Sequence, residues 1–227
     1  EAEVMARLSH ENIIRLIGFV EDLHNGKAWF VLPWEANGNV SEFLATGEWE
    51  IPERVSLDTF AGLEYLHMQQ PPICHGDLKS LNILVSASYR AIITDFGNST
   101  QITIVATSNQ LTLTGPTWSL RWAAPEVALG KQQNLASDIW AAGWICWEVM
   151  TNKVPFPDLN SEGAITLKVV QGEVPAARED TQLSQIVRLC SLMTDCWAFD
   201  PRNRPNIARC NSEVKWMVSR IFTDSRY

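Results

Sequence analysis

The spacing of apolar residues divides the chain into a short mixed part and a longer, mainly helical part. The apolar residues of segment 4–8 are spaced by one, three and four positions, which predicts one face of a helix. Residues 13–20 and 28–32 then form two apolar runs, with Asn25-Gly26 between them. Because such a pair between apolar runs is typical of a tight β-turn, we expect two strands after the first helix.

From Pro52 onward the apolar pattern has helical periodicity. Four apolar residues recur at three-residue steps and predict an amphipathic helix with one face in the core: Leu57, Phe60, Leu63 and Leu66. Pro71-Pro72 should end this helix. Trp140, Trp144 and Trp147, spaced by four and three, indicate the core-facing stripe of a second long helix. Shorter helices are expected at 39–46, 165–170 and 187–197.

A polar loop separates two short apolar runs within residues 73–85. It carries Asp77, Lys79 and Asn82, and Asp95 follows thirteen residues after Asn82 at the end of another apolar run. A hairpin between these runs would bring Asp95 beside Asn82, so that two carboxylates, an amide and a lysine converge. Mg²⁺ prefers hard oxygen ligands and takes only one or two from protein when phosphates and water supply the rest. The set therefore predicts a site for Mg²⁺ and phosphate.

The order Asp-x-Lys-x-x-Asn and then Asp-Phe-Gly resembles the catalytic loop and metal-binding turn of the protein kinases. The resemblance implies that Asp77 accepts the proton of a substrate hydroxyl and that Lys79 neutralises the γ-phosphate. It also implies that Asn82 and Asp95 hold Mg²⁺ and contact ATP. Phosphoryl transfer needs positioning and charge neutralisation more than covalent chemistry, which suits this residue set.

The same resemblance implies a nucleotide site around the start of the chain. Residues 1–12 are similar to the glutamate-bearing helix of the kinase small lobe, so that Glu1 would pair with the ATP-orienting lysine. Leu32 would lie at the back of the adenine pocket, and Pro33 and Glu35 would bond the adenine through their backbone. Leu84 is expected in the same site. Neither a Gly-x-Gly-x-x-Gly nor a Val-Ala-x-Lys sequence occurs in the 227 residues, so we expect a domain truncated before this helix, with weak ATP binding and little transfer.

Residues 95–126 resemble a kinase activation segment. Gly76 stands where many kinases carry an arginine that pairs with a phosphate on this segment. We therefore expect that a phosphate on the activation segment does not act by pairing with the catalytic loop. Three threonines are candidate phosphorylation sites: Thr112, Thr114 and Thr117. Ser119 keeps a hydroxyl that could bond Asp77 and Lys79.

Further landmarks lie in the second half of the chain. Glu126, in Ala-Pro-Glu, would pair with Arg204, and Asp138 would bond back to the backbone of the catalytic loop. Lys79 together with the Cys-Trp pair at 196–197 indicates the tyrosine-kinase-like group of serine/threonine kinases. The fold class implied is α+β, a kinase-like two-lobe fold with an incomplete small lobe. We expect a partial small lobe at 1–32, a hinge at 33–38, a mostly helical large lobe at 39–218 and a tail at 219–227.

Composition limits the partners. The formal net charge is −8 and no run of Lys or Arg stands out, so nucleic acid is not expected as a partner. The longest apolar stretch, 139–150, is interrupted by Glu148 and is too short to span a membrane. Five cysteines form no Cys-x-x-Cys pair, which indicates reduced core residues in an intracellular, cytoplasmic protein. The partners expected are ATP and a protein substrate; the oligomeric state is not indicated.

Four functions compete at this point. The first is an ATP-dependent protein serine/threonine kinase, or a poorly active piece of one. The second is a pseudokinase that binds proteins, which the sequence before Glu1 would distinguish from the first. An unrelated Mg²⁺-dependent phosphotransferase conflicts with the landmarks at Glu126, Asp138 and Arg204, and a plain helical scaffold leaves the ordered polar set unexplained. The intact set of Asp77, Lys79, Asn82 and Asp95 favours the kinase.

Overall fold

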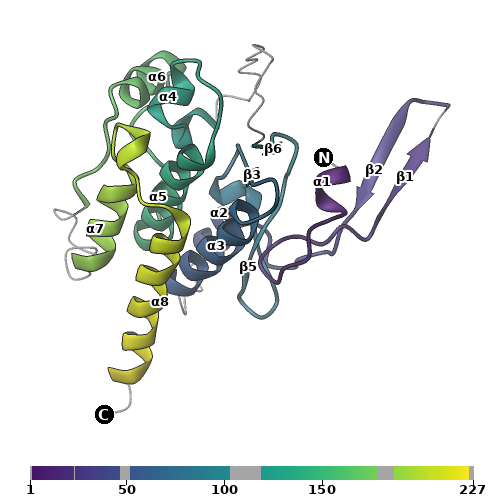
Figure 1. The fold of residues 1–227 in the computed structure, drawn as a ribbon, viewed down its shortest axis with the longest axis horizontal. Helices are drawn as coiled ribbons and strands as arrows, with labels where there is room; N and C mark the ends of the chain where they lie inside the picture. Colours follow the sequence, from purple (N-terminus) through teal and green to yellow (C-terminus); the bar gives the residue numbers. More distant parts are fainter. Residues whose placement is uncertain (1, 23, 47–51, 103–118, 178–186, 225–227) are drawn as a thin grey trace.

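The computed structural model describes residues 2–22, 24–46, 52–102, 119–177 and 187–224. Figure 1 shows a helical body with a two-stranded hairpin standing off one side of it. Among the described residues helix predominates and the strands are short, so the predicted α+β class is confirmed. None of the described helices is long and apolar enough to cross a membrane.

The N-terminal part contains helix α1 (Ala2–Met5) and the antiparallel strands β1 (Gly18–Asp22) and β2 (Lys27–Val31). Gly26 lies in the turn between the strands with a φ of 60°, a left-handed conformation that glycine adopts at little cost. The turn at Asn25-Gly26 and the strand predicted at 28–32 are therefore confirmed, and the predicted helix is present but ends at Met5.

The strand predicted at 13–20 is only partly right, because its first half pairs elsewhere. Ile13 forms a parallel bridge with Ile93 of strand β5 (Ala91–Ile93), and the N–H of Ile14 donates to the Ile93 carbonyl at 2.8 Å. Both Ile13 and Ile14 are buried. The backbone of Ile13 and Ile14 is thus engaged with the helical body, and contact with β2 begins where the Ile17 N–H donates to the Val31 carbonyl at 2.9 Å.

The β1–β2 hairpin exposes large apolar side chains. Phe19 lies opposite Phe30 and Val20 opposite Trp29, yet Phe19 is 57% and Trp29 50% exposed. Figure 1 shows the hairpin extending away from the helices. The hairpin therefore adds little to the core.

Four helices build the centre of the body: α3 (Pro52–His67), α5 (Leu135–Thr151), α7 (Val187–Cys196) and α8 (Ile207–Asp224). Helix α3 packs against α5 and α8, and α7 packs against α5. Nearly every residue of α5 is buried, as expected for a helix that is apolar around its whole circumference. The shorter helices α4 (Pro125–Ala128) and α6 (Glu162–Val170) contact each other at one end of the body (Figure 1).

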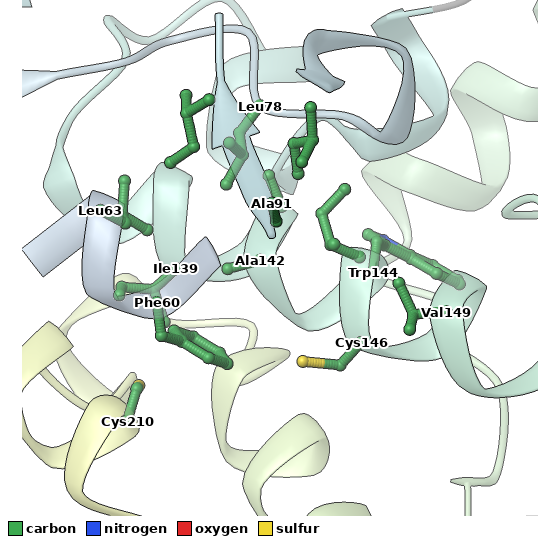
Figure 2. Packing of buried hydrophobic residues seen from close by; sticks show 14 of the residues in the cluster. Phe60, Leu63, Leu78, Ala91, Ile139, Ala142, Trp144, Cys146, Val149 and Cys210 are labelled. Carbon is green, nitrogen blue, oxygen red and sulfur yellow. The ribbon is translucent and has the colours of Figure 1, made fainter. Parts of the chain in front are cut away.

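The core joins side chains from α3, α5, α8 and the small strands. Figure 2 shows Phe60 of α3, Ile139 and Trp144 of α5, Ala91 of β5 and Cys210 of α8 in one cluster. The predicted apolar face of α3 is confirmed, because its inward residues are buried or packed against this cluster. The tryptophan stripe is likewise core: all three of its members on α5 are buried.

Two of the predicted helices differ from the pattern at their ends by a few residues, and helix α8 was not predicted. Helix α2 (Val40–Ala45) begins after Asn39, whose Oδ1 accepts the N–H of Glu42 at 3.0 Å while Glu42 Oε2 accepts the N–H of Asn39. This capping box satisfies two backbone donors that have no partner in the helix. Helix α6 begins at Glu162, before the predicted 165, and α8 continues past residue 218 to Asp224.

Two short antiparallel strand pairs on the helical body position the polar loop. Strand β3 (Ile73–Cys74) pairs with β6 (Thr100–Gln101), and β4 (Ile83–Val85) pairs with β5. Asp58 of α3 anchors the β4–β5 hairpin: it accepts two bonds from the Arg90 guanidinium, at 2.7 and 2.8 Å, and the N–H of Ala91 at 3.1 Å. A bidentate carboxylate–guanidinium pair fixes orientation as well as distance.

Candidate active site

The polar loop between β3 and β4 brings three of the predicted residues into direct contact. Lys79 Nζ donates to Asp77 Oδ2 at 2.7 Å. Asn82 Nδ2 donates to the Asp77 carbonyl at 2.9 Å and to Asp77 Oδ2 at 3.2 Å. Asn82 lies in the 3₁₀ helix Ser80–Asn82, which leads directly into β4. The Asp77 carboxylate is thus held by an ammonium group and an amide at once.

Ser119 reaches this cluster from a segment 40 positions away. Lys79 Nζ donates to Ser119 Oγ at 2.8 Å, so the ammonium group bridges Asp77 and Ser119. Ser119 begins the 3₁₀ helix Ser119–Trp122. The predicted contact of Ser119 with Lys79 is confirmed.

Asp95 lies at the far end of the β4–β5 hairpin. The N–H of Thr94 donates to the Asn82 carbonyl at 2.9 Å, so the hairpin predicted to bring Asp95 back toward Asn82 is confirmed. Asp95 is exposed and has a φ of 63°, a left-handed conformation that is strained for a residue with a side chain. Such strain persists where the surroundings enforce it, and it is common at functional sites.

Asp138, in the first turn of α5, supports the loop through its backbone. Its carboxylate accepts the N–H groups of His75 at 2.8 Å and Gly76 at 3.0 Å, as predicted, and it also meets His67 Nε2 at 2.9 Å. Burial alone would raise the pKa of Asp138. The hydrogen bond and charge of His67, the charge of His75 and the Gly76 N–H outweigh that effect and lower the pKa. Asp138 therefore stays ionised in the core and fixes the entry to the polar loop.

His75 connects the polar loop to the turn after β5. Its side chain is fully buried, its Nε2 lies 3.0 Å from the Thr94 carbonyl, and its Nδ1 accepts the Asp77 N–H at 3.3 Å. The ring lies 5.3 Å from that of Phe96. Because both ring nitrogens are engaged with backbone, His75 has a structural role.

Gly76 occupies a place where no side chain fits. Its φ is 79°, and an added Cβ would lie 2.7 Å from the Asn98 carbonyl oxygen and also collide with Gln133. Gln133 Nε2 donates to the Gly76 carbonyl. The side-chain amide of Gln133 therefore fills the space beside Gly76, next to Asp77.

Three of the residues expected to contact a nucleotide lie in the segment between β2 and α2. Leu32, Pro33 and Glu35 are each half-buried. Leu84 of β4 is also half-buried and bridges Asn39 at the end of this segment. Glu1 and the three candidate threonines lie outside the described residues. A role of these residues in nucleotide binding stays a prediction.

The segment after Ser119 is tied firmly to the helical body. Arg204 donates to both carboxylate oxygens of Glu126, at 2.6 and 2.7 Å, and both side chains are buried, which confirms the predicted pair. Arg121 donates to three backbone carbonyls of the loop that follows α5, those of Pro155, Phe156 and Leu159. Both terminal nitrogens of this guanidinium thus fix the two segments to each other.

Two buried polar residues were not predicted from the sequence. His67, at the end of α3, contacts Asp138 across 71 positions of the chain, and nothing in the sequence signals that pairing. Glu148 of α5 is 3% exposed; it accepts the Ser80 hydroxyl at 2.9 Å and the Trp122 indole N–H at 2.6 Å. A single acid inside the apolar stretch 139–150 was a signal that could have found Glu148.

Taken together, the polar loop holds a carboxylate, an ammonium group and an amide in direct contact, an arrangement that suits proton abstraction from a hydroxyl beside a phosphate. This chemistry belongs to phosphoryl transfer. The model for the family described as protein tyrosine and serine/threonine kinase matches residues 1–214. The chain belongs to this protein kinase family.

The chain is similar to several serine/threonine kinases over nearly its whole length. It is 30% identical to the probable serine/threonine-protein kinase roco6 of Dictyostelium discoideum, over 97% of this chain and 11% of roco6. It is 30% identical to the serine/threonine-protein kinase CTR1 of Arabidopsis thaliana, over 92% of this chain and 25% of CTR1. It is 28% identical to the receptor-interacting serine/threonine-protein kinase 4 of Mus musculus, over 95% of this chain and 28% of that kinase. The resemblance to the tyrosine-kinase-like group is confirmed, and the chain spans a minor part of each relative.

Proposed function

We propose that residues 1–227 are part of a catalytic domain that transfers the γ-phosphate of ATP to a serine or threonine hydroxyl of a protein, and that these residues alone transfer phosphate poorly. One observation carries the proposal: Asp77 Oδ2 contacts both Lys79 Nζ and Asn82 Nδ2, while Lys79 also contacts Ser119. Asp77 is thereby oriented to accept a hydroxyl proton, and Lys79 lies beside it to neutralise phosphate charge.

The residues present fit the Mg²⁺ that this family generally uses. Asn82 directs its Nδ2 to Asp77, and its Oδ1 accepts no hydrogen bond from the described residues, so the oxygen is left for a cation. Asp95 is exposed beyond the same hairpin and offers carboxylate oxygens. No group of three His, Cys, Asp or Glu side chains gathers among the described residues, which suits a cation held mainly by phosphates and water. Bound there, Mg²⁺ would neutralise the phosphate charge.

The rest of the assignment extends this site. The residues proposed to contact the nucleotide are Leu32, Pro33, Glu35, Leu84 and Glu1. The division into a partial small lobe (1–32), a hinge (33–38), a large lobe (39–218) and a tail (219–227) is also a proposal. An intracellular, cytoplasmic location is proposed because all five cysteines are buried free thiols.

Phosphorylation of a serine/threonine peptide mixture by the full-length protein, with and without Asp77→Asn, tests the proposal. Loss of a positioned proton acceptor should lower kcat by about 10²- to 10⁴-fold with little change in the KM for ATP. Asp195→Asn, an exposed carboxylate on α7, is the matched control and should retain activity. Equal transfer by wild type and Asp77→Asn would contradict the proposed role.

A protein-binding module without catalysis is the second candidate, and the exposed apolar side chains of the β1–β2 hairpin favour it. Thermal unfolding with and without Mg²⁺ and ATP distinguishes the two. A kinase should gain stability when its nucleotide is added. A wild-type protein that neither transfers phosphate nor responds to the nucleotide supports the binding module.

A further inference from the structure

Glu148 bridges two segments that are far apart in the sequence. Oε1 accepts the hydroxyl of Ser80 at 2.9 Å, and Oε2 accepts the indole N–H of Trp122 at 2.6 Å. All three side chains are buried. Each oxygen of the carboxyl group therefore contacts a different segment, and both contacts start from helix α5.

The two segments are those that build the proposed site. Ser80 follows Lys79 directly and begins the 3₁₀ helix that ends at Asn82. Trp122 ends the 3₁₀ helix that Ser119 begins. Because Lys79 also contacts Ser119, the segments are joined twice: by Lys79 at the site and by Glu148 beneath it.

A carboxyl group at the position of Glu148 is unfavourable for stability alone. Among the described residues no cation pairs with it, and burial raises its pKa to about 8 despite the bonds from Trp122 and Ser80. Burial of such a group costs free energy that an apolar side chain of similar size avoids. A purely packing role would be filled better by Leu, whereas only a side chain with two hydrogen-bonding atoms can join Ser80 to Trp122.

We propose that Glu148 is a positioning residue that couples residues 119–122 to the catalytic loop, so that Asp77 and Lys79 keep their geometry only while Trp122 is bonded. The proposal rests on the proposed function in one respect: it takes the loop that carries Asp77 and Lys79 to be catalytic. The coupling itself is a physical property that can be measured without any phosphate transfer.

Hydrogen exchange of the full-length protein tests the coupling. Glu148→Leu and Trp122→Phe each remove the bridge, and Glu148→Gln keeps it because the amide oxygen can accept from Trp122 while its NH₂ donates to Ser80 Oγ. Thr151→Ala is the matched control, since it removes a buried hydroxyl from the same helix, one that donates to the Trp147 carbonyl and has no other hydrogen bond among the described residues. The amides that report on the loop are those of Asn82 and Ile83, which bond to Lys79 and Ser80.

Loss of the bridge should speed exchange at residues 80–85 about fivefold, the effect of one hydrogen bond of about 1 kcal/mol. Glu148→Gln and Thr151→Ala should leave that exchange unchanged. If Trp122→Phe fails to fold, Ser80→Ala provides the reciprocal measurement, because it removes the same bridge from the other segment. Exchange at Ala123 should then be faster. Unchanged exchange at 80–85 in Trp122→Phe, or at 120–123 in Ser80→Ala, overturns the coupling.

Kinetics then separate positioning from packing. Glu148→Leu should lower kcat at least fivefold with little change in the KM for ATP, and Glu148→Gln should restore it. Equal kcat in Glu148→Leu and wild type overturns the positioning role. A wild-type protein without transfer refutes the proposed function instead, and the exchange result still decides whether Glu148 couples the two segments.

Discussion

The carboxyl group of Glu148 makes the stability of the protein depend on pH. Burial in α5 raises its pKa from the ordinary 4.5 to about 8. Below pH 4.5 the group is protonated in both the folded and the unfolded chain. As the pH rises from there to about 8, the unfolded chain releases the proton and the folded chain retains it, so the folded state loses relative stability.

We therefore expect Glu148 to lower the free energy of unfolding by up to about 1.4 kcal/mol per pH unit within this window. Urea unfolding at pH 5, 6, 7 and 8 measures the effect. The same series on Glu148→Gln, which has no ionisable group at this position, should lack this component. Identical pH dependence in the two proteins would mean that the carboxyl group is not buried as described.

Gly76 shows a second effect at the scale of one residue, since both its backbone conformation and its neighbours exclude a side chain. Gly76→Ala should destabilise the protein by more than the roughly 1–2 kcal/mol expected for a left-handed L-residue, because Gln133 and the Asn98 carbonyl also crowd the new Cβ. Gly130→Ala is a matched comparison: its φ is 86°, and nothing lies within 4 Å of its Cβ position.

Chemical denaturation of Gly76→Ala and Gly130→Ala measures the loss of stability in each. The difference between the two losses gives the effect of crowding, because both variants carry the backbone strain. Gly18→Ala, at an ordinary φ with open space around it, should be close to neutral. Equal losses in Gly76→Ala and Gly130→Ala would show that Gln133 moves aside freely. The arginine that many kinases carry at the Gly76 position has no room here.

At the scale of elements, helix α5 organises the site because Asp138 and Glu148 both project from it. Its start is fixed by a capping box in which Asn134 Oδ1 accepts the N–H groups of Ala136 and Ser137, at 2.9 and 3.1 Å. The Ser137 hydroxyl returns the interaction by accepting the Asn134 N–H at 2.9 Å. Asp138 follows this cap directly, so the cap also sets where the Asp138 carboxylate lies.

We expect Asn134→Ala to destabilise the protein by about 1 kcal/mol, the usual effect of losing an N-cap side chain. Urea denaturation measures the change, and Asn160→Ala, at an exposed position before α6, is the control. The variant should also speed hydrogen exchange of the His75 and Gly76 amides, which Asp138 binds. If Asn134→Ala lowers the global stability but leaves exchange at those amides unchanged, the cap does not set the position of the Asp138 carboxylate.

The sequence predicted those parts of the fold and site that depend on local spacing. Periodicity located α3 and α5, the Asn25-Gly26 pair located the turn, and the order of polar residues indicated that Asp77, Lys79 and Asn82 lie together. Apolar spacing reports that a segment is buried but not what buries it, so the pairing of Ile13 with Ile93 was missed. The contact of His67 with Asp138 was also missed, since it joins residues that only the packing of α3 on α5 brings together.

At the scale of the whole molecule, the buried cysteines allow opening of the fold to be timed region by region. Cys74 lies in β3, Cys146 in α5, Cys190 and Cys196 in α7, and Cys210 in α8, and all five are buried free thiols. Burial raises the pKa of Cys146 to about 12 and also raises that of Cys74, so neither forms a thiolate while folded. An alkylating reagent can react only when a region opens. The order in which the five sites become labelled would therefore record the order in which the strands and helices separate.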